Sequence, residues 1–136
     1  MNGLVEFLRA RLDEDVEVAR AAADCHDEDS PTWAVITPGF VHNGEDGMWS
    51  RLTSVDRPAV ADHMVRFDPA RVLAEVDAKR ETIRLYEEAC AFIEMMKEQG
   101  KEAPAHVGAA EAYLNVIRDD AAVYADHPDY QEEWRP

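Results

Sequence analysis

The stretch between Asp68 and Gly100 constrains the fold most, because it predicts one long, unbroken helix. Asp68 is a good N-cap residue, and Pro69 suits the first helical position, where a missing N–H costs nothing. Between Pro69 and Gly100 the chain has no further proline or glycine, and Gly100 favours a left-handed stop. Such a helix would be about 45 Å long, so other elements must pack along it.

Apolar residues recur in this helix at alternating steps of four and three, which predicts packing against another helix at a shallow angle. The positions are Val72, Val76, Lys79, Ile83, Tyr86, Cys90 and Ile93, with one polar member, Lys79. A second series with this spacing follows Pro104, namely Val107, Ala110, Leu114, Ile117, Ala121 and Tyr124. Two such series joined by a short connector predict an antiparallel helical hairpin.

The residues before the long helix predict three further elements. Residues 3–23 form an amphipathic helix with Leu4, Leu8, Leu12, Val16 and Ala19 on one face. Residues 32–37 are β-branched and aromatic, with a continuation at 40–42 past a bulge, and residues 48–55 alternate as a return strand after turn chemistry at 43–47. A short helix that opens at residues 56–59 and runs to about Arg66 follows, capped by Asp56, with Val60, Met64 and His63 as candidates for its inward face.

The expected fold class is therefore α+β and mostly α. Its order is an N-terminal helix, a small antiparallel β-hairpin at about 32–55, a short helix and a long antiparallel helical hairpin. Residues 1–125 are expected to form a single domain and residues 126–136 an acidic aromatic tail.

Four aromatic residues are candidates for an interaction surface: Trp33, Trp49, Tyr130 and Trp134. For the two in the hairpin, the alternative is that they anchor the strands on the helices, since a lone hairpin is marginal in water. For the two in the tail, which are four residues apart, the alternative is a docked helical turn.

The net charge of −15 comes from 29 acidic against 14 basic residues, which disfavours direct binding to nucleic acid or to an anionic membrane. No apolar run is long enough for a membrane span, and the N-terminus lacks the pattern of a signal peptide. Two cysteines are too few for a disulfide framework. We therefore expect a cytoplasmic protein with no membrane partner.

No residue set in the sequence predicts catalysis, a bound metal or a cofactor. The loop from Asp24 to Pro31 brings Cys25 and His26 together with carboxylates, but no second Cys/His pair stands at zinc-site spacing. His26, His63 and His127 each adjoin an aspartate, a combination that does not by itself orient a general base. The expectation is a protein that is not an enzyme.

Three stretches resemble a known family: EFLRARLDED, VADHMVRFDPARVLAEVDAKR and YADHPDYQEEW. They are similar to a family of small uncharacterised proteins from actinobacteria and their phages, and the middle stretch more weakly resembles Ea22-like phage proteins. Many relatives have Cys-x-x-Cys clusters between the long helix and the ending, whereas this chain has Cys90 alone in that region. The resemblance implies a phage or prophage setting and transfers no functional residue.

These observations favour a non-enzymatic phage or prophage accessory protein that acts through protein–protein interaction. Its partner would be a host or phage protein, and a homodimer is an alternative. A second hypothesis is an acidic mimic of nucleic acid that inhibits a DNA-binding host protein, because acids cluster at 13–17, 24–29 and 126–133. A third is a small enzyme or metal-binding protein.

Overall fold

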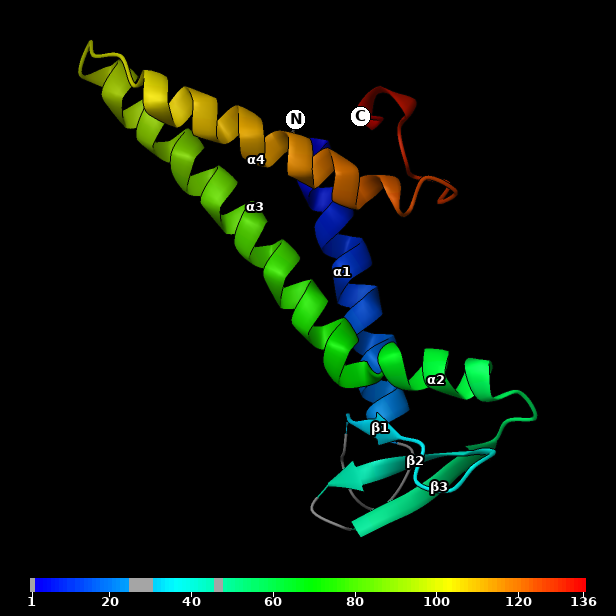
Figure 1. Ribbon diagram of the computed structural model, residues 1–136. Coiled ribbons are helices and arrows are strands. Elements are labelled where there is room, and N and C mark those ends of the chain that lie inside the picture. Colours follow the sequence, from blue (N-terminus) through cyan, green and yellow to red (C-terminus); the bar gives the residue numbers. More distant parts are fainter. Residues whose placement is uncertain (1, 25–30, 46–47) are drawn as a thin grey trace. The chain divides into compact units, whose positions relative to one another are not determined.

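The computed structural model describes residues 2–24, 31–45 and 48–136 (Figure 1). Within them lie four α-helices and a three-stranded antiparallel sheet, which confirms the expected class and element order. The elements are α1 (Asn2–Ala23), β1 (Trp33–Ala34), β2 (Phe40–Glu45), β3 (Met48–Ser54), α2 (Pro58–Arg66), α3 (Pro69–Glu98), α4 (Pro104–Ala122) and a short 3-10 helix, η1 (Glu132–Trp134).

Contacts group the chain into two compact units, which are described separately. Unit 1 comprises Met1–Leu12 and Asp77–Pro136, and unit 2 comprises Asp13–Val76. The boundaries fall inside α1 and inside α3. The division expected from the sequence, a domain over 1–125 and a tail over 126–136, stays a prediction.

Unit 1 is built on the helical hairpin of α3 and α4. α4 runs back beside α3 (Figure 1), and the rings of Phe92 and His106 stack across the hairpin with centroids 3.8 Å apart. The predicted face of the last helix is buried from Ala110 to Ala121, but Val107 in its first turn is 41% exposed. The buried apolar and aromatic side chains of the unit are Leu4, Val5, Phe7, Leu8, Leu12, Ile83, Tyr86, Ala89, Ala110, Leu114, Ile117, Ala121 and Trp134.

The corner between α3 and α4 is closed by Gly100. Its φ of 67° is left-handed, its N–H donates to the carbonyl of Lys97 at 2.9 Å, and the N–H of Lys101 donates to that of Met96 at 2.9 Å. These two bonds satisfy carbonyls that the end of a helix leaves without partners. The stop predicted at Gly100 is therefore present.

The sheet of unit 2 has the order β1-β2-β3, with β2 in the centre. The expected first strand was too long, because the chain turns at Gly39, whose φ is 84°, and the Phe40 N–H bonds the Thr37 carbonyl at 3.0 Å. β1 therefore pairs back onto β2, with Trp33 opposite Asn43. A register irregularity lies at Val41/His42, where β2 pairs with β3.

Two details of α2 differ from expectation. The cap position is Arg57, which makes no side-chain capping bond, so the predicted cap at Asp56 was wrong. The buried residue is Ala61, whereas Val60 is 45% exposed. The backbone of Arg57 is extended, and the helix starts at Pro58. With this start, Ala61 lies on the buried side of the helix, which contacts β1 and β2.

Candidate interaction site

An apolar pocket in unit 2 is a candidate site for binding. Its volume is about 320 Å³, and its wall comes from the second half of α1, from β1 and from the start of α3. Val18 is 70% exposed and Phe67 is 44% exposed, so large apolar side chains lie open at this site. The lining residues are Asp15, Val18, Ala19, Ala22, Trp33, Phe67, Pro69 and Val72.

Asp68 fixes the part of the pocket wall that comes from β1 and α3. Its side chain is 8% exposed and accepts hydrogen bonds from the backbone N–H of Arg71 at 2.9 Å and of Trp33 at 3.2 Å. The first of these bonds caps α3, as the sequence predicts. The Ala70 N–H also donates to the Pro31 carbonyl at 2.9 Å. Trp33, Phe67 and the first turn of α3 are therefore held together.

A second, polar hollow of about 410 Å³ lies on α2 and the start of α3, and Phe67 belongs to the walls of both hollows. Its other lining residues are Ala59, Asp62, His63, Arg66 and Arg71. The Arg71 guanidinium carbon lies 4.4 Å from the centroid of the Phe67 ring, and the His63 ring centroid lies 4.7 Å from it. An arginine over an aromatic face is held by the negative charge of that face.

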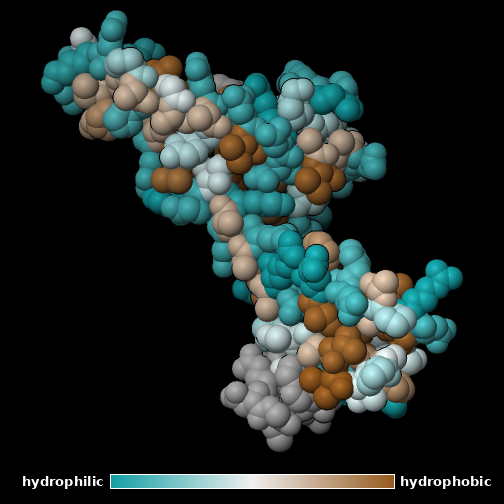
Figure 2. All heavy atoms as spheres, viewed as in Figure 1, coloured by the Kyte–Doolittle hydropathy of each residue, from teal (hydrophilic) through white to brown (hydrophobic). Residues whose placement is uncertain are grey.

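Exposed apolar and polar atoms adjoin one another on unit 2. Figure 2 shows hydrophobic atoms gathered over the elements of unit 2 in the lower part of the view, with hydrophilic atoms around them. The exposed large apolar residues of this unit are Val18, Val35, Ile36, Val60 and Phe67.

The structure places the four candidate aromatic residues in different surroundings. Trp33 is half-buried in the wall of the apolar pocket. Trp49 lies opposite Gly44 in the sheet, and its side chain is outside the described part of the chain. Tyr130 and Trp134 belong to unit 1, where both pack on Phe7, with ring centroids 5.8 and 5.2 Å away.

The C-terminal aromatic residues form a cluster on α1 of unit 1. Tyr124 and His127 also contact the Phe7 ring, and Arg11 hydrogen-bonds the His127 ring. Trp134 is 8% exposed, and its ring lies 3.5 Å from where a Cβ on Gly3 would be. In this conformation the tail is docked, the alternative that the sequence left open for Tyr130 and Trp134.

Unit 1 also carries an apolar hollow at the corner of its hairpin. It measures about 400 Å³ and is lined by Ile93, Lys97, Lys101, Glu102, Ala103, Pro104 and Val107. It offers no aromatic side chain.

No group of three or more metal-ligating side chains occurs in the described ranges, and the loop with Cys25 and His26 lies outside them. Cys90 is a half-buried free thiol beside Tyr86. Burial, and then the neighbouring Cys90, raise the pKa of the Tyr86 phenol above its ordinary value. Tyr86 and Cys90 line a hollow of about 360 Å³ in unit 1, together with Val5, Glu6, Arg9 and Glu87.

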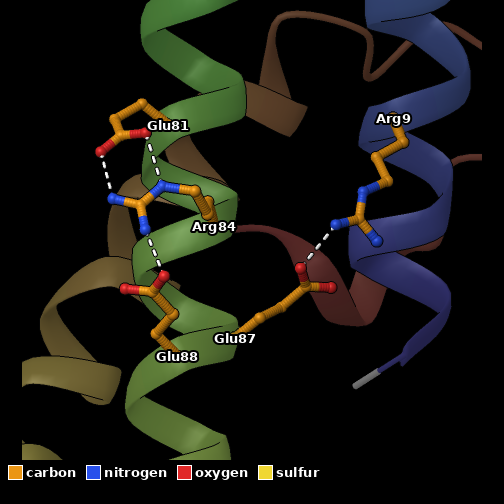
Figure 3. Close-up of polar contacts among 5 residues, drawn as sticks. All are labelled: Arg9, Glu81, Arg84, Glu87 and Glu88. Atoms are coloured by element: carbon orange, nitrogen blue, oxygen red, sulfur yellow. Dashed lines mark hydrogen bonds and ion pairs between the residues drawn. The ribbon is translucent and has the colours of Figure 1, made fainter.

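Much of the charge on α3 is neutralised within unit 1. Figure 3 shows Arg84 between Glu81, at 2.5 Å, and Glu88, while Arg9 of α1 reaches Glu87 at 2.6 Å. These pairs are exposed, so they add little to stability. They pair three glutamates of α3, Glu81, Glu87 and Glu88, with arginines.

Sequence reasoning found Trp33 and missed the other side chains of the pocket. Val18 lies outside the predicted apolar face of the first helix, which runs through Val16 and Ala19. An apolar residue out of phase with its helix was the available signal. Phe67 and Val72 also line this pocket.

A model for a family of unknown function, DUF6221, matches residues 1–136, so the chain belongs to that family. Searches of curated proteins and of solved structures found no significant match. Among the described residues, each helix is too short or too polar to cross a lipid bilayer.

Proposed function

We propose that this member of the family is a non-enzymatic protein that binds another protein through the apolar pocket of unit 2. The observation that supports this proposal is a pocket with Trp33 in its wall and with Val18 and Phe67 exposed. Interfaces draw most of their binding energy from a few apolar or aromatic anchors that fill such pockets. A partner side chain that enters this one would be buried on several sides.

Binding, not catalysis, is proposed because of what lines the pocket. Asp15 is the one titratable side chain in its wall. General acid–base chemistry needs a base and an acid oriented toward the same substrate. An apolar wall with one carboxylate suits an apolar guest better than a reacting one.

The proposed setting is a phage or prophage of an actinobacterium, with the protein in the cytoplasm. The support is the resemblance of the two ends and the middle block of the chain to phage-associated proteins. The partner would then be a host or a phage protein, or a second copy of this chain. No direct contact with nucleic acid is proposed, because the net charge of −15 would repel it.

Mimicry of nucleic acid is the weaker alternative. A mimic needs rows of unpaired carboxylates that stand in for phosphates. On α3 an arginine, Arg84, pairs with two of the glutamates, and Arg71 pairs with Glu75 at 2.7 Å. The longest helix is therefore poorly suited to this role.

The variant Val18→Asp tests the proposal. Valine and aspartate have similar helix propensities, so α1 should survive the change. A partner would bury the new carboxylate without a counter-charge, which costs about 3 kcal/mol or more, or over a hundredfold in affinity. The tagged protein would be purified from cells of the source organism, and retained proteins would be quantified by mass spectrometry.

The matched control is Val107→Asp, which makes the same change beside the apolar hollow of unit 1. We expect a specific protein to be retained by the wild type and by Val107→Asp and lost from Val18→Asp. Identical retention by all three forms would refute the proposed site. If only Val107→Asp failed to retain the protein, the binding site would lie at the corner between α3 and α4 instead.

A further inference from the structure

We infer that the segment docking on unit 2 is acidic as well as apolar, with its apolar side chain in the pocket and a carboxylate beside Arg66 and Arg71. This inference rests on the proposed function and specifies the chemistry of the partner. Its basis is the position of Phe67, which separates an apolar pocket from a hollow lined by two arginines and a histidine.

The charge of this region is opposite to that of the rest of the chain. Residues 57–71 contain three arginines and two aspartates, a net charge of +1 within a chain of −15, so all other residues together carry −16. One of the two aspartates, Asp68, is buried and accepts two backbone N–H bonds. A ligand at the surface therefore meets the arginines more readily than this carboxylate.

Arg71 is held in position to receive an anion. Its Nε donates to Glu75 at 2.7 Å and its Nη1 to the Arg66 carbonyl at 3.3 Å, while the Phe67 ring lies under the guanidinium. A guanidinium has five N–H donors, so these two bonds leave donors for a ligand. Because the side chain is already fixed, little of its freedom is lost on binding.

Arg66 is the second cation of the hollow. Its exposed side chain makes no ion pair with any residue in the described ranges, although Asp62 lines the same hollow one turn earlier in α2. Asp62 and Glu75 oppose an incoming anion in part. Exposed charges of this kind therefore select between partners and speed association more than they raise affinity.

Together the two hollows describe one kind of guest. The apolar pocket accepts a side chain such as leucine or phenylalanine, and the arginines accept an aspartate or glutamate close to it in the same segment. A basic segment would be attracted to the acidic remainder of the chain. At this surface, however, Arg66 and Arg71 would repel it. A nucleic acid strand would have to approach a protein of net charge −15.

Selection from a random displayed library of 12-residue peptides on the immobilised full-length protein tests the inference. We expect the enriched peptides to place an apolar residue within about four positions of an aspartate or glutamate. Synthetic copies of them should bind Arg66→Gln about two- to fivefold more weakly than wild type. The same change at Arg20→Gln, which is exposed on α1 and lines neither hollow, should leave binding unchanged.

The other outcomes separate the inference from the function on which it rests. Enriched apolar peptides without acids that still depend on Val18 would overturn the acidic preference and leave the proposed pocket standing. Binding weakened equally by Arg66→Gln and Arg20→Gln would reduce the effect to net charge and overturn the arginine site. Failure to enrich any peptide whose binding Val18→Asp abolishes would overturn both.

Discussion

Asp120 on α4 carries a carboxylate that its surroundings half bury. Burial raises its pKa above the ordinary value, the charge of Asp119 adds to this effect, and the charge of Lys79 opposes it. The raised pKa means that the folded state favours the protonated form. The resulting stability is present below the ordinary pKa of 3.8 and is lost as the pH rises through the folded value.

The variant Asp120→Asn should therefore be more stable than wild type at pH 7. The amide keeps the shape of the side chain and carries no charge to desolvate. The difference in melting temperature should shrink as the pH falls toward 4. Thermal unfolding followed by circular dichroism across this range measures it, with Glu111→Gln, an exposed change on the same helix, as the control. A gain in melting temperature that did not depend on pH would contradict a raised pKa of Asp120.

At the scale of elements, Asp68 connects α3 with β1. Asp68→Ala removes the acceptor for the N–H groups of both Arg71 and Trp33. Loss of a helix cap typically costs about 1 kcal/mol, and the second unpaired N–H raises the expected cost to about 2 kcal/mol. Denaturant unfolding measures the total, and amide hydrogen exchange at residues 33 and 71 shows whether these two groups are released.

The control for this prediction is Asp77→Ala, which removes an exposed carboxylate from the middle of α3. It should change stability little. If Asp68→Ala were equally mild, or if exchange at Trp33 stayed slow, then β1 would be held by contacts other than this carboxylate.

The docked tail is a second element whose role can be measured. Trp134 is buried against Phe7, so Trp134→Ala should destabilise unit 1 by about 3 kcal/mol through lost burial and the cavity left behind. Arg135→Ala, which removes an exposed partner of Glu132, is the control and should have little effect. A Trp134→Ala protein as stable as the control would show that the tail is undocked in solution and free for a partner.

The helices could be predicted from the sequence far better than the sheet. The apolar spacing is repeated many times along α1, α3 and α4, so a single exposed member such as Val107 does not change which helices are predicted. β1 contains two residues, and its position depends on the turn at Gly39 and on a hydrogen bond from Trp33 to Asp68, which lies 35 residues later. Spacing within a strand carries no information about such a distant contact.

The candidate site was predictable only in part, for the same reason. Trp33 is a large aromatic residue in a strand and attracts attention in any sequence. Phe67 belongs to the site because the hydrogen bonds of Asp68 hold it near Trp33. Val18 belongs to the site because α1 contributes to the same pocket. The docking of Tyr130 and Trp134 onto Phe7 joins residues more than a hundred positions apart, which periodicity cannot predict.

At the scale of the whole molecule, the proposed binding site lies on unit 2. Unit 1 contains most of the buried side chains, the docked tail and an apolar hollow without an aromatic wall. Unit 2 combines an apolar pocket walled by Trp33 and Phe67 with the net-positive stretch 57–71. This difference is the reason for placing the proposed binding site on unit 2.

Site-specific photo-crosslinking tests this assignment most directly, because it reports contact itself. A photoreactive amino acid would replace Val18 in one form of the protein and Val107 in another, and each form would be irradiated in cells of the source organism. The account predicts a crosslinked second protein from position 18 and none from position 107. Crosslinks from position 107 alone, or from neither position, would contradict it.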